Sequence, residues 1–246
     1  MKDYVIWDDE KEKITYEVLN KTDEKVVIAG INYRKIVQTQ LSSIKRADES
    51  LINSEMQHVH DYESCLLERK KHNGIAGTVL HFDSDINYLK KCIDLYEKVG
   101  IYCYPVLSQE KEYVKKIEDI KFVPDVVVIT GHDFYNGEDK RKMKSYTNSQ
   151  YFADAVKKIK MVYPCAVVVA GACQSNFEAL IANGADFASS PKRKNVHLYD
   201  PVVIAISVCT TSFRKIVDFN RREKYIKEIK DAYNGLETFG KMRLFY

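Results

Sequence analysis

From residue 75 onward, short apolar runs alternate with amphipathic segments, and this alternation constrains the fold more than any other feature. The runs are mainly Val, Ile, Leu and Ala, and they lie at 75–82, 101–107, 125–130, 166–170 and 186–188. Strands that are buried on both faces have continuous apolar sequences of this kind, and they are typical of parallel sheets. The intervening segments have helical spacing and lie at 86–99, 109–120, 148–163 and 174–183. The pattern predicts a mostly parallel α/β sheet with helices on both faces.

The first part of the chain has a different pattern. Residues 1–45 contain short β-branched and aromatic runs separated by charged turns, which predicts a small β module of three or four strands, similar to an SH3-like barrel. Residues 46–74 are polar and contain no proline, and they predict a helical connector. The α/β domain then covers 75–246. It is expected to continue with a helix over 200–209, a charged helix over 220–233 and a last strand over 241–246.

Composition excludes several classes of protein. The 246 residues include 38 basic and 35 acidic residues, a balance that gives no indication of nucleic-acid binding. No apolar run approaches the roughly 20 residues that span a bilayer, and the N-terminus has no apolar signal segment. The six cysteines are scattered without a C-x-x-C pair, and His58 and His60 do not share a helix face. We therefore expect a cytoplasmic protein with no metal, no cofactor and no membrane partner.

Chemically active side chains follow the apolar runs. In open α/β sheets the functional crevice lies beyond the carboxyl ends of the strands. One such run ends in Gly131-His132-Asp133, and the next ends in Gly171-Ala172-Cys173-Gln174. If these two runs are neighbouring parallel strands, a thiol and an imidazole meet at one edge of the sheet. The edge also receives the ends of two other strands, with Asp83, Asp85, Ser189 and Ser190.

Cys173 and His132 together indicate nucleophilic catalysis. A helix predicted from residue 174 would place Cys173 at a helix N-terminus, where the partial positive charge stabilises a thiolate. His132 could take the thiol proton or protonate a leaving amine. The N–H groups at the start of that helix, around Ala172 and Gln174, could hold an oxyanion, and Asp133 or a backbone carbonyl could orient the imidazole. Each residue alone has a structural alternative, namely packing for the cysteine and capping for the histidine.

Longer motifs in the same region resemble a known family. The stretches ITGHDFYNG (129–137), YTNSQYFADAVKK (146–158) and VVVAGACQSNFEALIANGADFASSPKRKNVHLYDPV (167–202) closely resemble the YabG family of sporulation-specific proteases. HFDSD followed by YLKKCIDLYEKVGI (81–101) is similar to the same family. This resemblance implies a cysteine endopeptidase of spore formation with a pattern like that of caspases and gingipains. It implies a caspase-like or flavodoxin-like sheet, with Cys173 as nucleophile and His132 as its partner. It also implies that the N–H groups of Asp133 and Gly131 help to hold the oxyanion.

The resemblance also suggests a substrate and a location. It implies that the enzyme processes spore coat or other spore proteins after Arg or Lys, in the mother-cell cytoplasm and at the coat. In caspase-like folds the pocket for the P1 side chain is walled by the ends of the first and fifth strands, here Asp83, Asp85, Ser189 and Ser190. An aspartate would pair with a basic P1 side chain. The structural alternative is that Asp85 caps the helix over 86–99.

Three further hypotheses stay open. The basic cluster 192–194 is either a surface turn or a site of self-processing by a protease that cuts after basic residues. A cysteine amidase or glutaminase on a flavodoxin-like sheet is an alternative enzyme, although its nucleophile turn favours glycine where this chain has Ser175. A non-catalytic protein that binds the spore coat is the third possibility.

Overall fold

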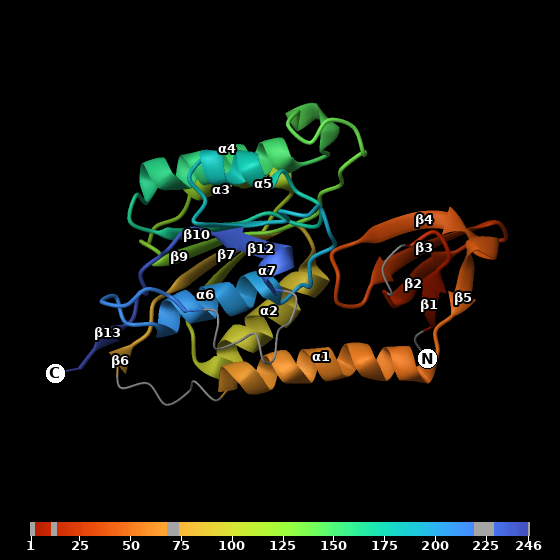
Figure 1. Cartoon of the computed structure of the whole chain (residues 1–246), viewed down its shortest axis with the longest axis horizontal. Helices are drawn as coiled ribbons and strands as arrows, with labels where there is room; N and C mark the ends of the chain where they lie inside the picture. Colours follow the sequence, from red (N-terminus) through yellow and green to blue (C-terminus); the bar gives the residue numbers. More distant parts are fainter. Residues whose placement is uncertain (1–2, 11–13, 68–73, 219–228, 246) are drawn as a thin grey trace.

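A six-stranded sheet forms the centre of the molecule (Figure 1). The computed structural model describes residues 3–10, 14–67, 74–218 and 229–245. The strand order is β12-β11-β10-β9-β7-β8; the strands from β7 to β11 are parallel, and β12 is antiparallel to β11. The mostly parallel sheet is therefore confirmed. The strands are β7 (Val79–Asp83), β8 (Cys103–Leu107), β9 (Val126–Ile129), β10 (Val167–Ala170), β11 (Phe187–Ser189) and β12 (Tyr233–Gly235).

Helices cover both faces of this sheet, as expected from the alternating pattern. One layer consists of α3 (Tyr113–Glu118), α4 (Ser149–Val162) and α5 (Phe177–Ala182). The opposite layer consists of α2 (Ile86–Val99) and α6 (Asp200–Thr210), and α1 (Glu49–Leu67) packs against both of them. The helix α1 lies within residues 46–74, for which the sequence predicts a helical connector. None of the helices in the described ranges is long and apolar enough to cross a membrane.

The C-terminal part differs from the sequence prediction. Of the helix expected over 220–233, residues 220–228 lie outside the described residues. The structure has a short helix α7 (Ile229–Ala232), and Tyr233 already begins strand β12. From Tyr233 to Gly235 the chain pairs with β11 as a strand and does not continue the expected helix. The expected last strand is reduced to β13 (Arg243–Leu244), which pairs with β6 (Gly74–Ile75).

The N-terminal part forms a separate antiparallel sheet with its own core. Its five strands are β1 (Tyr4–Trp7), β2 (Tyr16–Lys21), β3 (Lys25–Gly30), β4 (Ile36–Gln40) and β5 (Ile44–Arg46), in the order β4-β3-β2-β1-β5. This confirms the predicted β module and adds a strand to it. Tyr16, Val26 and Ile28 are fully or almost fully buried between the strands. The strands β4 and β5 form the two edges.

The loop between β3 and β4 fastens this small sheet to the α/β domain. Its Ile31 carbonyl accepts a hydrogen bond from Lys91 Nζ at 2.7 Å, and the carbonyls of Gly30 and Tyr33 accept from the Tyr88 hydroxyl at 2.7 Å each. Figure 1 shows the N-terminal sheet beside that end of the central sheet at which the strands β9 and β10 terminate. The two sheets therefore share a boundary at the edge where the sequence predicts the active site.

Arg34 makes the deepest contact across this boundary. Its side chain is only 3% exposed, and its Nε and Nη2 donate to Asp83 Oδ2 at 3.0 and 2.9 Å. Nη1 donates to the Leu198 carbonyl at 3.0 Å. Thr130 Oγ1 and the Asp85 N–H also donate to the Asp83 carboxylate, at 2.8 and 3.0 Å. Each buried charge is thus matched by its partner and by further hydrogen bonds, which burial of an ion pair requires.

Asp83→Ala should destabilise the protein strongly. Removing one partner of a buried ion pair leaves an uncompensated charge, so we expect the free energy of unfolding to fall by about 3–5 kcal/mol. Asp85→Ala is the matched control two residues away, because it removes a helix cap and should cost only about 1 kcal/mol. Urea unfolding of both variants measures the difference. Equal losses in the two variants would show that the Arg34–Asp83 pair is not a main source of stability.

Candidate active site

Cys173 and His132 come from neighbouring strands, as the sequence predicts. Strand β9 pairs with β10 in parallel register, with Ile129 opposite Ala170, and each of the two residues follows its strand by three positions. Both side chains line one cavity of about 530 Å³. The cavity lies between the central sheet and the N-terminal sheet, because Trp7 and residues 34–38 form another of its walls. The strands therefore bring a thiol and an imidazole to one enclosed site.

The turn that carries Cys173 differs from the prediction. The helix α5 begins at Phe177, not at residue 174, and it has only six residues. Gln174 adopts a left-handed backbone with φ 59°, and the side chain of Asn176 caps the helix by accepting from the Ala179 N–H. Cys173 thus lies in a tight turn four residues before the helix. A helix N-terminus consequently does not explain activation of the thiol.

The thiol instead interacts with the chain near Val196. The Val196 N–H lies 3.3 Å from Cys173 Sγ and donates to it, while the Val196 carbonyl lies 3.8 Å away and can accept the S–H. Only 4% of Cys173 is exposed. A backbone N–H directed at sulfur favours the thiolate, since hydrogen bonds to the charged form stabilise it.

The imidazole of His132 is held on both sides. Its Nδ1 lies 3.0 Å from the backbone carbonyl of Arg34, so Nδ1 carries a proton and donates it. Nε2 lies 3.5 Å from Asp85 Oδ2. Burial opposes the charge on His132, but the interactions with Asp85 and the Arg34 carbonyl outweigh it and raise its pKa. The backbone carbonyl beside the imidazole is that of Arg34, and Nε2, which lies beside Asp85, is the ring nitrogen that the main chain does not hold.

Asp85 has the complementary electrostatics. Its carboxylate accepts from the N–H groups of Asn87 at 2.8 Å and Tyr88 at 3.4 Å, which confirms that it caps α2. Burial favours the neutral acid, but the bonds from His132 and Asn87 outweigh it and lower the pKa of Asp85. Asp85 therefore combines a structural role with a charge beside His132. Asp83, the other predicted pocket residue, is fully buried under the Arg34 guanidinium.

The carboxylate of Asp133 stabilises the turn that contains Cys173. It accepts from the hydroxyls of Ser149 and Ser175 and from the Asn148 N–H, the latter two at 2.9 and 2.8 Å. Burial outweighs these bonds and raises the pKa of Asp133. The carboxylate of Asp133 is held by these groups and does not orient the imidazole of His132. The Asp133 N–H donates to no acceptor in the described ranges.

The other predicted supporting residues are mostly engaged in hydrogen bonds. The Ala172 N–H donates to Ser175 Oγ at 2.9 Å, and the Gln174 N–H donates to the Lys194 carbonyl at 3.2 Å. Gly131 allows a close approach, because a Cβ there would lie 2.5 Å from Glu110 Oε1. That carboxylate accepts the His132 N–H at 2.8 Å.

Ser189 and Ser190 support the turn from the end of β11. Ser189 Oγ donates to the Ala172 carbonyl at 2.7 Å, and Ser190 Oγ donates to the Lys194 carbonyl at 2.9 Å. Both serines are fully buried, and neither lines the cavity that holds Cys173. The structure therefore places them behind the cysteine turn.

The basic cluster 192–194 belongs to the same support. Arg193 is only 8% exposed, and its guanidinium contacts the Tyr146 hydroxyl at 2.7 Å, the Ser190 carbonyl at 3.1 Å and the Glu178 carboxylate. Lys192 and Lys194 pair with Asp231. These contacts favour the structural interpretation of the cluster over a site of self-processing.

The sequence gives no sign that the N-terminal sheet contributes to the site. Arg34 gives no local signal, because it lies in a polar turn of the β module and its contacts span 49 residues to Asp83 and 98 to His132. Trp7 was equally hidden within a strand pattern. Only the packing of the two sheets shows that both residues line the site.

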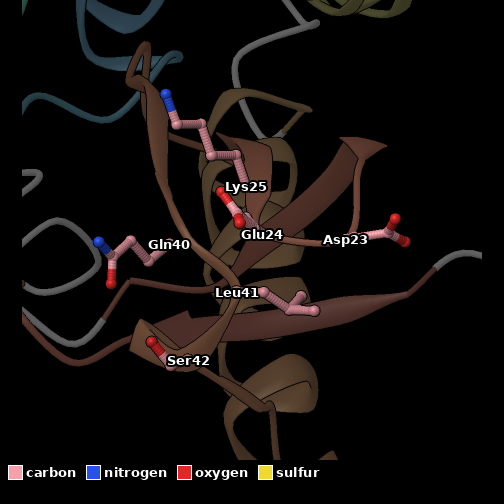
Figure 2. Close-up of a pocket in the computed structure, with 6 residues that line it drawn as sticks. All are labelled: Asp23, Glu24, Lys25, Gln40, Leu41 and Ser42. Carbon is pink, nitrogen blue, oxygen red and sulfur yellow. The ribbon is translucent and has the colours of Figure 1, made fainter.

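A second cavity of similar size lies elsewhere on the N-terminal sheet. Figure 2 shows it at the β2–β3 turn and the end of β4, where the side chains of Asp23, Lys25 and Gln40 point in different directions. Its polar groups do not converge on a common point, and neither Cys173 nor His132 reaches it. In the described part of the chain, no group of three or more His, Cys, Asp or Glu side chains is placed to hold a metal ion.

Asp85→Asn should lower the pKa of His132. Asparagine is as good a helix cap as aspartate, so the substitution removes the charge beside Nε2 while keeping the cap of α2. Titration of the His132 ring followed by NMR measures the pKa directly. Asp154→Asn, on the exposed side of α4, removes the same charge away from the site and should leave the pKa unchanged. An unchanged His132 pKa in Asp85→Asn would contradict this assignment.

Comparison with known proteins identifies the family of this chain. The family model described as YabG peptidase U57 matches residues 2–246. The chain is 35% identical over 210 residues to the sporulation-specific protease YabG of Bacillus subtilis (strain 168), a match that covers 81% of this chain and 70% of the relative. No solved structure matches. The chain belongs to the YabG peptidase U57 family.

Proposed function

We propose that this peptidase is a cysteine endopeptidase of sporulation in which Cys173 is the nucleophile and His132 the acid–base partner. The observation that carries the proposal is their shared position: both side chains line one cavity at the ends of paired strands. The Arg34 carbonyl holds His132 Nδ1, so proton transfer falls to Nε2, which in the structure contacts Asp85. The Val196 N–H directed at the sulfur supports a thiolate. These features support the assignment of a nucleophile and its base.

The proposed reaction proceeds in two halves. His132 Nε2 takes the proton of the Cys173 thiol, and the sulfur forms a bond to the scissile carbonyl carbon. The imidazolium then gives its proton to the leaving amine as the C–N bond breaks, which leaves an acyl-enzyme. A water molecule then gives a proton to His132 while its oxygen bonds to the thioester carbon; the C–S bond breaks, the new carboxyl end of the substrate leaves, and the imidazolium returns its proton to the Cys173 sulfur.

An oxyanion forms in both halves and requires donors. The Asp133 N–H is the best candidate, because it follows His132 directly and has no acceptor in the described ranges. The N–H groups of His132, Ala172 and Gln174 donate to Glu110, Ser175 and Lys194, so these three support the turn instead. Preorganised donors of this kind contribute a large share of catalysis in acyl transfer.

The finer part of the proposal concerns substrates. The family indicates protein substrates, and we propose spore coat and related proteins cut after Arg or Lys, in the mother cell and at the coat. Asp85 is 15% exposed beside His132, whereas Asp83 is buried with Arg34. Asp85 does not line the cavity around Cys173, but it is the more exposed of the two carboxylates and lies beside His132, and we propose it as the partner of a basic side chain. Asp83 acts by holding Arg34.

Cys173→Ala should abolish cleavage of carboxymethylated casein, and His132→Ala should reduce it by about 10²–10⁴-fold, the usual contribution of acid–base catalysis. Cys165→Ala is the matched control, because Cys165 is an exposed free thiol outside the cavity and its loss should leave the rate unchanged. Iodoacetamide at neutral pH should alkylate Cys173 faster than Cys165, although Cys173 is less exposed. Full activity of Cys173→Ala would exclude the proposed mechanism.

Asp85→Asn should also change specificity. We expect it to lower the ratio of kcat/KM for an Arg peptide to that for the matching Leu peptide, because the proposed partner carboxylate is lost while the cap is kept. Using the ratio cancels any effect of the variant on His132, which acts on both peptides alike. If the ratio is unchanged, another group selects the P1 side chain.

A further inference from the structure

The strand β4 is an open sheet edge that lies along the catalytic cavity. It pairs with β3 on one side only and is the last strand of the N-terminal sheet. Residues 34–38, which include the first half of β4, line the cavity that holds Cys173 and His132. The hydrogen-bonding edge of β4 and the proposed nucleophile thus lie along the same cavity.

The register of β4 shows which backbone groups face outward. The Gly30 N–H donates to the Lys35 carbonyl at 2.8 Å, and the Leu41 N–H donates to the Glu24 carbonyl at 2.9 Å. Opposed residues in an antiparallel pair alternate between bonded and non-bonded pairs. With Ile36 opposite Ala29 and Gln38 opposite Val27, the alternation directs the N–H and C=O groups of Ile36, Gln38 and Gln40 away from β3. No further backbone partner of Ile36 or Gln38 occurs in the described ranges, whereas Gln40 leads directly into the 3-10 turn Leu41–Ser43.

This edge lacks the charged residues or proline that the edge strands β5 and β8 carry. Exposed edges usually carry charged residues or proline, which prevent another chain from pairing with them. The opposite edge of the same sheet, β5, carries Lys45 and Arg46, and the edge strand β8 of the central sheet contains Pro105. By contrast, β4 reads Ile-Val-Gln-Thr-Gln, with neither charge nor proline.

We propose that the polypeptide substrate binds as an additional strand on the outer edge of β4, with main-chain hydrogen bonds to Ile36 and Gln38. This inference rests on the proposed function and extends it, because it assigns the subsite that holds the chain on one side of the scissile bond. Main-chain pairing gives affinity for extended segments with little dependence on their sequence. The substrates would then be extended or unfolded segments, not folded surfaces.

The walls around the edge suit such a segment. Ile36 and Phe134 line the cavity with 46% and 56% of their surface exposed, and they can contact apolar side chains of a bound strand. Trp7 lines the same cavity, and its indole N–H is buried without an acceptor in the described ranges. A carbonyl of the bound segment is a suitable acceptor, since buried donors are normally paired.

Proline substitutions on β4 test the proposal in the full-length chain. Gln38→Pro removes an outward N–H without touching the bonds to β3, so kcat/KM for a long, unstructured Arg peptide should fall by about tenfold, as expected for a lost hydrogen bond and local crowding. The control Gln40→Pro removes the next outward N–H on the same strand but lies outside the catalytic cavity, at the cavity of Figure 2. Its backbone φ of −75° already suits proline, and its kcat/KM should be unchanged.

A second readout separates substrate binding from chemistry. In both proline variants, alkylation of Cys173 by iodoacetamide should keep the rate of the parent chain, because the thiol is not altered. Fluorescence anisotropy of the labelled peptide should show weaker binding to Cys173→Ala carrying Gln38→Pro than to Cys173→Ala alone. This measurement holds even if the parent chain cleaves nothing, so failure of the proposed function and failure of strand addition give different results.

A substrate-side experiment covers the case in which Gln38→Pro does not fold. Peptides that are N-methylated at one position each should bind Cys173→Ala more weakly at every second residue, because alternate amides of an added strand point toward β4. Loss at alternate positions supports the proposal. Equal effects of the two proline variants, or N-methylation losses without a two-residue period, would overturn it.

Discussion

The ion pair between Arg34 and Asp83 is the contact on which the arrangement of the site depends. Burying a guanidinium is costly unless its donors are matched, and here Nε, Nη1 and Nη2 all have acceptors. The same residue presents its carbonyl to His132. Fixing the side chain of Arg34 therefore fixes its main chain as well. The orientation of the His132 imidazole thus depends on the ion pair between Arg34 and Asp83.

Three titratable side chains near the end of β7, namely those of His81, Asp83 and Asp85, have different electrostatic roles in the site. Burial lowers the pKa of His81 to about 3, so this histidine is neutral and bonds to Thr130 at 2.9 Å. Asp83 is matched to Arg34, which leaves Asp85 as the carboxylate beside His132. The raised pKa of His132 and the lowered pKa of Asp85 are two effects of one interaction. The Asp85 carboxylate thus stabilises the charged form of His132, which in the proposed mechanism protonates the leaving amine.

Local sequence patterns predicted the central sheet and the meeting of Cys173 with His132, because continuous apolar runs report burial and paired parallel strands end at one edge. They failed where side chains compete with the backbone. Ser175 and Asn176 bond to nearby N–H groups, which delays the helix to Phe177. The assignment of Asp83 to a substrate pocket missed a partner 49 residues away that no spacing rule reveals.

The two sheets divide the work of the site in a way that neither could do alone. The central sheet supplies the thiol and the imidazole, while the N-terminal sheet supplies the carbonyl that sets the tautomer of His132 and one wall of the cavity. Parallel strands buried on both faces are poor places to bind a peptide, because their edges and faces are covered. An antiparallel module with an open edge removes that restriction. Placing such a module beside the carboxyl ends of β9 and β10 joins the proposed strand-binding edge to the proposed nucleophile without altering the core that holds Cys173.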